Sequence, residues 1–165
     1  MYKLFPIFLL IVFAPLCLAK SVEEGKPAPS VNAKLLDGTT FALSGKMGKV
    51  VIINFWATWC APCREEMPAL ETYYQQHRAE GLELIAISID TPGDIEKVRE
   101  VMRAYHFSAA LIGDANVKEY GRIWRIPMTF IIDRKGILRK NGWSGAPKID
   151  LIDLEKNVTP LLAAP

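Results

Sequence analysis

Short apolar runs alternate with amphipathic segments along this chain. The β-branched run at residues 50–53 is of the kind that fills a strand buried on both faces. Residues 82–89 predict a second buried strand. Between them, Met67, Leu70 and Tyr74 recur at helical spacing. The pattern therefore predicts a strand–helix–strand unit at the centre of the fold.

Further strands and helices are predicted on both sides of this unit. Asp37-Gly38 is a strong hairpin-turn signal between strands at 31–36 and 39–43. Thr91 and Pro92 have the residue types of an N-cap and a first helical position. The remaining predictions are a strand at 109–112, a helical turn at 116–120, a hairpin of strands at 129–132 and 137–139, and a final helix at 149–158 ended by Thr159-Pro160. This order indicates an α/β layered sheet with helices on both faces.

The N-terminus has the pattern of a secretory signal peptide. Lys3 precedes an apolar run at 4–18, and the small residue Ala19 provides a cleavage point before Lys20. The run is shorter than the roughly 20 apolar residues that span a bilayer, so an uncleaved membrane anchor is the less favoured alternative. We expect a signal peptide at 1–19, cleaved after Ala19, and a single domain at 20–165.

Net charge and cysteine content limit the classes of function that this chain can have. The 165-residue chain has a net charge of +2 and no long basic run, which does not indicate a nucleic-acid partner. The predicted mature chain keeps only Cys60 and Cys63, in a compartment where disulfides persist. A purely structural disulfide is the alternative, but closing so short a loop stabilises a chain by only about 2 kcal/mol. Redox activity is therefore favoured.

Cys60-x-x-Cys63 lies where the predicted strand ends and the predicted helix begins. The free N–H groups and the dipole at a helix N-terminus stabilise an anion, so a cysteine there is more easily a thiolate. In such motifs the thiol pKa falls to roughly 3.5–7.5 from about 8.5. The first cysteine would attack a disulfide, and the second would resolve the mixed disulfide.

The sequence around the motif resembles the thioredoxin superfamily, and more closely its TlpA/ResA-like extracytoplasmic branch. The resemblance is carried by the string Asn54-Phe55-Trp56-Ala57-Thr58-Trp59-Cys60-Ala61-Pro62-Cys63-Arg64-Glu65-Glu66. Asn54 stands where thioredoxin has a buried Asp, and Glu66 matches the Glu that the branch carries three residues past the second cysteine. The resemblance implies a thioredoxin-like fold, in which helices flank a central mixed β-sheet and an N-terminal β-hairpin is added.

The resemblance also implies roles for particular residues. Cys60 would be the nucleophile and Cys63 the resolving thiol, while Glu66 would tune Cys63 or relay a proton to it. Alternatively, Glu66 only complements the helix dipole. A substrate-docking rim is expected at Trp59, Pro62, Ile126 and Pro127.

Pro127 is expected to be cis and to face the cysteine pair. The Ile126 backbone would then pair with an extended peptide. If the resemblance did not hold here, Pro127 would be an ordinary proline at a strand edge.

Other chemistries of a cysteine pair fit less well. A peroxiredoxin would need Pro and Thr where this chain has Ile53 and Ala57, and covalent haem attachment would need His in place of Arg64. A zinc site lacks ligands, because His77 and His106 are far apart in the sequence. Two thiolates can hold Cu(I), so a Cu(I) metallochaperone remains the non-enzymatic alternative.

The direction of the redox reaction follows from the residues between the cysteines. Strongly oxidising relatives carry a His there, which stabilises the reduced form. Ala61-Pro62 resembles the reducing members instead. We therefore expect a thiol–disulfide reductase, and keep a disulfide-forming oxidant as an alternative. The expected location is the periplasm and the expected oligomeric state is a monomer. Neither a cofactor nor a metal is expected.

The expected partners come from the family resemblance alone. One is a specific protein disulfide, for example in cytochrome c maturation or copper-site assembly. The other is a membrane thiol transporter of the DsbD/CcdA kind, which would supply electrons.

Overall fold

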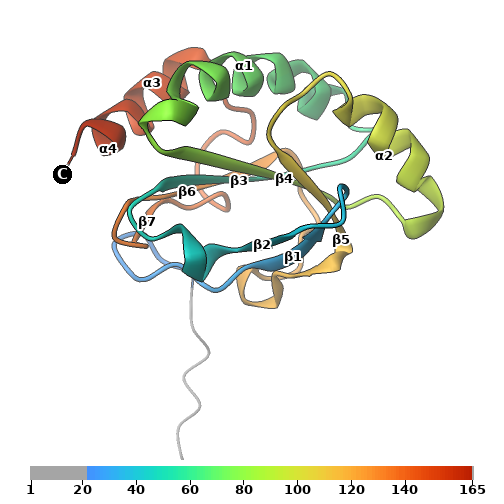
Figure 1. Cartoon of the computed structure of the whole chain (residues 1–165), viewed down its shortest axis with the longest axis horizontal. Helices are drawn as coiled ribbons and strands as arrows, with labels where there is room; N and C mark the ends of the chain where they lie inside the picture. The colour runs from blue at the N-terminus through green and yellow to red at the C-terminus, as the bar shows by residue number, and fades with distance from the viewer. Residues whose placement is uncertain (1–21, 165) are drawn as a thin grey trace, which may run out of the picture.

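Seven strands form one mixed sheet in the computed structural model, which describes residues 22–164 (Figure 1). Their order across the sheet is β2-β1-β5-β4-β3-β6-β7. The central strands β3, β4 and β5 run parallel, while β6 and β7 are antiparallel additions on one side. The bounds are β1 Asn32–Leu35, β2 Thr40–Ala42, β3 Val50–Trp56, β4 Leu82–Ser88, β5 Ser108–Asn116, β6 Met128–Ile132 and β7 Leu138–Lys140. The predicted signal peptide, residues 1–19, lies outside the described residues.

The α-helices cover one face of this sheet (Figure 1). They are α1 Ala61–His77, α2 Ile95–Met102, α3 Leu151–Asn157 and α4 Thr159–Ala163. Alternate residues of β3, such as Val50 and Ile52, belong to the same buried cluster as Met67 and Leu70 of α1. Each helix contributes residues to this cluster, because each turns an apolar stripe toward the strands.

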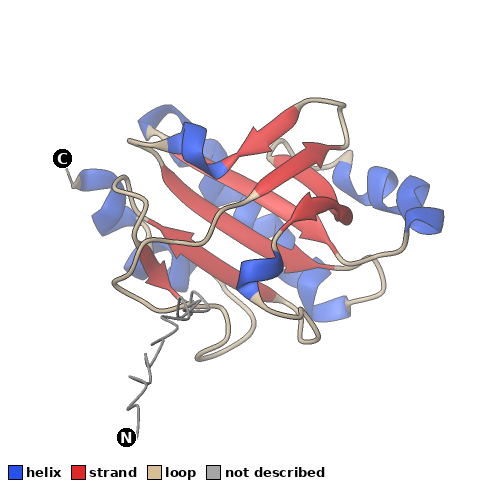
Figure 2. Ribbon diagram, turned by 90° about the horizontal axis from the view of Figure 1, so that it is seen from below, coloured by secondary structure: helices blue, strands red, loops and turns tan. Residues whose placement is uncertain are grey.

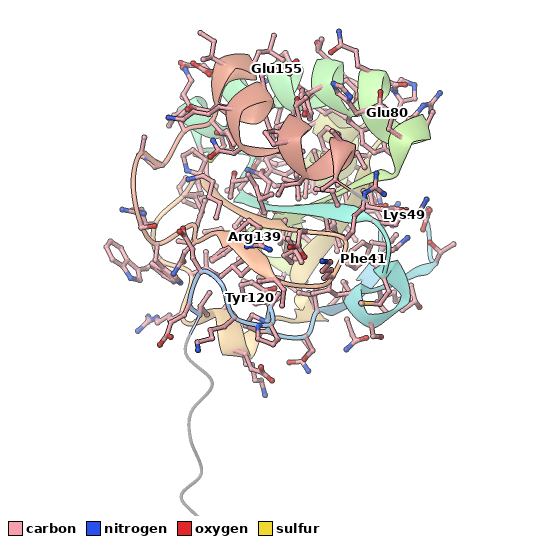
Figure 3. The ribbon with its side chains drawn as sticks, turned by 90° about the vertical axis from the view of Figure 1, so that its left-hand side faces the viewer. Phe41, Lys49, Glu80, Tyr120, Arg139 and Glu155 are labelled. Atoms are coloured by element: carbon pink, nitrogen blue, oxygen red, sulfur yellow. A yellow bond between two sulfur atoms is a disulfide. The ribbon has the colours of Figure 1, made fainter. Side chains whose placement is uncertain are left out.

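The opposite face carries the other residues of β3, which lie in a second cluster with Phe41, Tyr120 and Phe130. Figure 3 labels Tyr120 and Phe41 on this side of the sheet and Glu155 among the helices. The prediction of helices on both faces therefore differs from the structure in one respect. β5 runs to Asn116 to pair with β1, so the following segment forms only the 3₁₀ turn η4 Lys118–Tyr120. In Figure 2, loops, strands and short helical turns face the viewer on this side.

The predicted N-terminal hairpin is present, with β1 and β2 paired antiparallel. Its turn is stabilised by Asp37, whose Oδ1 accepts hydrogen bonds from Thr39 N at 2.9 Å and Thr39 Oγ1 at 2.7 Å. Gly38 has φ of 90°, a value that side-chain-bearing residues rarely adopt. Because β1 also pairs with β5, the hairpin forms an edge of the central sheet.

The C-terminal helix differs from its predicted bounds. α3 starts after an Asp150 N-cap that forms a capping box with Asp153, and it ends at Asn157. Thr159-Pro160 then begins the short helix α4. Proline is well tolerated in the first turn of a helix, because the N–H that it lacks would have no helical partner there. Pro160 therefore starts a new helix after the old one has ended.

Candidate active site

The two cysteines lie at the junction between β3 and α1, where the sequence predicted them. Cys60 is the N-cap of α1, and its Sγ accepts a hydrogen bond from Cys63 N at 3.3 Å. The two residues are joined by a disulfide. Cys60 is 6 % exposed and Cys63 is fully buried. Of the two sulfur-bearing residues, Cys60 is thus the one that solvent reaches, and its sulfur sits where a helix terminus stabilises negative charge.

Glu66 is buried one helical turn after Cys63, on the side of α1 that faces the sheet. Its Oε1 accepts a hydrogen bond from Asn54 Nδ2 at 2.7 Å, and its Oε2 accepts one from Ile149 N at 2.9 Å. Burial raises the pKa of Glu66 to about 7, against the lowering effect of these two hydrogen bonds and of the Lys148 charge. A carboxyl group with such a pKa can take up or release a proton near neutral pH.

Asn54 connects Glu66 to the strand that follows Pro127. It pairs with Thr129 in the register of β3 against β6, and its Nδ2 also donates to Thr129 Oγ1 at 3.0 Å. Its Oδ1 is buried without a hydrogen-bond partner. A polar residue at the helix-facing position of a buried strand was the signal for this contact, but only the fold shows which groups it meets.

The Ile126–Pro127 peptide bond is cis, as the sequence analysis expected. Pro127 is buried immediately before β6, whose first residue, Met128, pairs with Phe55 of β3. Ile126 packs against the buried cluster that contains both cysteines. The segment around Pro127 and the cysteine motif therefore belong to the same end of the sheet.

Exposed residues lie beside the cysteines in the sequence and before the cis-proline segment. Trp59, directly before the first cysteine, is 69 % exposed, and Pro62 between the cysteines is also exposed. A second exposed tryptophan, Trp124, precedes the cis-proline segment and lies 6.2 Å from Trp143 between ring centroids. The sequence analysis did not single out Trp124, although its position three residues before Pro127 was a usable signal.

A further contact was missed by sequence reasoning. Asp90, just past the end of β4, accepts hydrogen bonds from Thr58 N at 2.8 Å and from Thr58 Oγ1 at 2.7 Å. Thr58 is two residues before Cys60, so the carboxylate of Asp90 holds the backbone that leads into the motif. No pattern within either segment indicates that the two would meet.

The described residues, 22–164, contain neither a metal-binding cluster nor a helix that could span a membrane. None of the described His, Cys, Asp and Glu side chains forms a group of three or more suited to hold a metal ion. Within the same residues, every helix is too short or too polar to cross a bilayer.

A buried strand that ends in a Cys-x-x-Cys pair at a helix N-terminus, on this fold, defines the class of thioredoxin-like thiol–disulfide oxidoreductases. Comparison with known proteins supports this class. The model of the AhpC/TSA family matches residues 24–141, and the chain belongs to that family.

Named relatives support the same class, and a solved structure shows the same fold. The chain is 35% identical over 120 residues to the thioredoxin-like protein YneN of Bacillus subtilis, covering 72% of this chain and 70% of that protein. It is 33% identical over 144 residues to the thiol-disulfide oxidoreductase ResA of Bacillus thuringiensis, covering 86% of this chain and 82% of that protein. A thiol:disulfide interchange protein of Chlorobium tepidum has the same fold, with a TM-score of 0.70 at 24% identity over 87% of this chain and all of that structure.

Proposed function

We propose that this protein is an extracytoplasmic reductase of specific protein disulfides. The observation that carries the proposal is the Cys60–Cys63 disulfide at the N-terminus of α1, with Cys60 the more exposed residue. A thiolate at that position would be stabilised by the helix terminus and could be reached by a substrate, while the fully buried Cys63 would react only with its neighbour.

The reaction is a sequence of two thiol–disulfide exchanges. The Cys60 thiolate attacks one sulfur of the substrate disulfide, a Cys60–substrate disulfide forms, and one substrate thiol leaves. Cys63 then attacks the Cys60 sulfur, which releases the second substrate thiol and forms the Cys60–Cys63 disulfide. The substrate gains two electrons and two protons, and the enzyme pair loses them. An external dithiol must restore the reduced pair.

Glu66 would accept the proton of the Cys63 thiol in the second exchange. With its pKa raised to about 7, the carboxylate is a better base near neutral pH than an ordinary glutamate. Its position three residues after Cys63 puts both on neighbouring turns of one face of α1. The hydrogen bonds from Asn54 and Ile149 keep the carboxylate oriented.

A protein substrate would dock on the rim formed by Trp59, Pro62, Ile126 and Pro127. Trp59 offers a large exposed apolar surface directly before the nucleophile. The Ile126 backbone precedes β6 and would pair with an extended substrate peptide as an added strand.

The reducing direction is supported by Pro62, which stands where strong oxidants carry a His that stabilises the reduced form. The proposed setting is the periplasm, reached through the signal peptide at 1–19. A membrane thiol transporter of the DsbD/CcdA kind would supply electrons. The proposed substrates are disulfides met in cytochrome c maturation or copper-site assembly.

The decisive experiment is the reduction potential of the Cys60–Cys63 pair, measured by equilibrium with glutathione. A value near that of thioredoxin, about −270 mV, is expected of a reductase. A value near about −120 mV would identify a disulfide-forming oxidant and overturn the direction proposed here. Tight 1:1 binding of Cu(I) by the reduced protein, without turnover of protein disulfides, would instead favour a metallochaperone.

The order of attack is tested with two serine variants. Cys63→Ser should accumulate a disulfide between Cys60 and a protein substrate, because the resolving thiol is missing. Cys60→Ser is the matched control and should accumulate none. Equal trapping by both variants would contradict the assignment of Cys60 as the nucleophile.

A further inference from the structure

The parallel pairing of β3 with β4 brings Asp90 next to the segment that leads into α1. Trp56 pairs with Ser88 at the ends of the two strands, which lie side by side in Figure 1. Thr58 and Asp90 each follow two residues later. Because the carboxyl ends of parallel strands meet at the same edge of a sheet, Thr58 and Asp90 lie next to each other at that edge.

The Asp90 side chain is surrounded by donors. The residue is 4 % exposed, and its carboxylate accepts three hydrogen bonds. Two come from Thr58, and the third comes from Ser88 Oγ to Asp90 Oδ2 at 2.6 Å. Ser88 Oγ itself accepts from Asp90 N at 3.0 Å, so its proton is directed at the carboxylate. A site made only of donors suits an ionised carboxylate, which can only accept.

The charge of Asp90 has no ion-pair partner among the described residues. Among residues 22–164, no lysine, arginine or histidine makes an ion pair with Asp90. The hydrogen bond to Asp94 raises the pKa of Lys97 on α2, and the charge of Asp90 contributes slightly to this rise. Lys97 Nζ, however, donates to Asp94 Oδ1 at 2.7 Å, and its side chain is largely exposed. A buried and unpaired charge is screened by salt much less than a surface charge. The negative charge of Asp90 therefore acts on its surroundings.

We propose that Asp90 is a positioning residue of the redox pair, which anchors the segment before Cys60 and, by its buried negative charge, disfavours the thiolate of the reduced state. This role rests on the proposed function, because a pair whose reduced form is less stable is the stronger reductant. The helix terminus attracts a thiolate at Cys60, and Asp90 opposes part of that attraction.

The charge can be removed with little change of shape by Asp90→Asn. An asparagine whose Oδ1 replaces Asp90 Oδ2 can still accept from Thr58 N and Ser88 Oγ. Its Nδ2 can donate to Thr58 Oγ1, because a hydroxyl can reverse from donor to acceptor. All three hydrogen bonds then persist, one of them reversed. The variant therefore removes the charge of Asp90 and keeps the hydrogen bonds that anchor Thr58.

The measurement is the equilibrium of the pair with glutathione, in which two glutathione thiols give two electrons and two protons to the Cys60–Cys63 disulfide. Asp90→Asn should shift this equilibrium toward the reduced pair by about tenfold, which is about 30 mV less negative. Asp94→Asn removes a partly exposed carboxylate a few residues away and should shift this equilibrium by less than twofold. Equal equilibria for Asp90→Asn and the wild type would overturn the proposed effect of the charge.

The anchoring role has its own variant, which also serves if Asp90→Asn does not fold. Thr58→Val removes the hydroxyl donor and leaves the Asp90 charge and the Thr58 N–H in place. The reduced variant should react with iodoacetamide at Cys60 severalfold more slowly, while its equilibrium with glutathione changes by less than twofold. A wild-type alkylation rate would overturn the anchoring role.

The two proposals fail in different ways. The potential of the wild-type pair decides whether the protein is a reductase. The difference between Asp90→Asn and wild type decides the role of Asp90, whatever that potential is. Contributions from other charged groups on α1, such as Arg64 and Glu66, are the same in both proteins and cancel in the difference.

Discussion

Asn54 donates a hydrogen bond from Nδ2 to Glu66 Oε1 at 2.7 Å, and this contact joins the central strand β3 to α1 inside the protein. A carboxyl group in such a place is removed from water, which disfavours its charged form. Two hydrogen bonds recover only part of that cost, so the pKa of Glu66 stays raised, at about 7. The protonation of Glu66 is therefore linked to the folding of the protein.

This linkage predicts a pH-dependent stability. The ordinary pKa of a glutamate is 4.5, so between pH 4.5 and 7 the unfolded chain releases the proton and the folded protein keeps it. The free energy of unfolding should thus fall as the pH rises through this window, by on the order of 3 kcal/mol from this group. Glu66→Gln should remove that part of the slope, as measured by urea unfolding at pH 4.5 to 8.

The matched control for this experiment is Glu65→Gln. Glu65 is the exposed neighbour on α1 and pairs with Lys148 at 2.9 Å on the surface. Its replacement should leave the pH profile of the wild type nearly unchanged, because surface ion pairs contribute little. Parallel profiles for Glu66→Gln and the wild type would show that the Glu66 carboxyl is not proton-linked to folding.

Trp59→Ala should weaken substrate docking without affecting the fold. The side chain is mostly exposed, so the free energy of unfolding should change by less than about 0.5 kcal/mol. KM for a protein disulfide should rise severalfold, because a large apolar contact is lost. The control is Ile152→Ala, because Ile152 is also exposed and apolar but lies on α3, and this variant should leave KM unchanged. A normal KM for Trp59→Ala would remove Trp59 from the docking rim.

Arg134→Ala should destabilise the end of the sheet. The guanidinium donates to the backbone oxygens of Gly48 at 2.7 Å, Glu80 at 2.9 Å and Leu162 at 2.8 Å, which belong to three separate segments. We expect a loss of about 2 kcal/mol in chemical denaturation. Lys135→Ala, at the exposed next residue, should lose almost nothing, and equal losses would contradict the bridging role.

Gly142 is packed too closely against β6 to carry a side chain. A Cβ there would lie 2.5 Å from Met128 Cγ and 3.1 Å from Thr129 O. Gly142→Ala should therefore cost about 1–3 kcal/mol by overpacking, and lower the urea midpoint accordingly. At Gly45 the space for a Cβ is open, so Gly45→Ala should be tolerated. Equal midpoints for the two variants would mean that β6 shifts without cost.

Much of the fold and the centre of the site were predictable from sequence. The run at 50–53 and the spacing of Met67 and Leu70 specify a buried strand and a helix, because each pattern follows from the geometry of one element. The same local information placed Cys60 and Cys63 at the junction. The resemblance of the surrounding string added the thioredoxin-like sheet and the cis bond at Pro127, both of which the structure contains.

Contacts between elements were decided by the tertiary structure alone. The meeting of Thr58 with Asp90 depends on the register of β3 against β4, and that of Glu66 with Ile149 on how the chain before α3 returns to α1. The pairing of β5 with β1, which carries β5 on to Asn116, is a third contact of this kind. Periodicity reports which face of an element is apolar, but it does not report which distant residue that face will meet. The sequence by itself thus located the cysteine pair at the start of a helix, and the fold decided which charged and polar groups surround that pair.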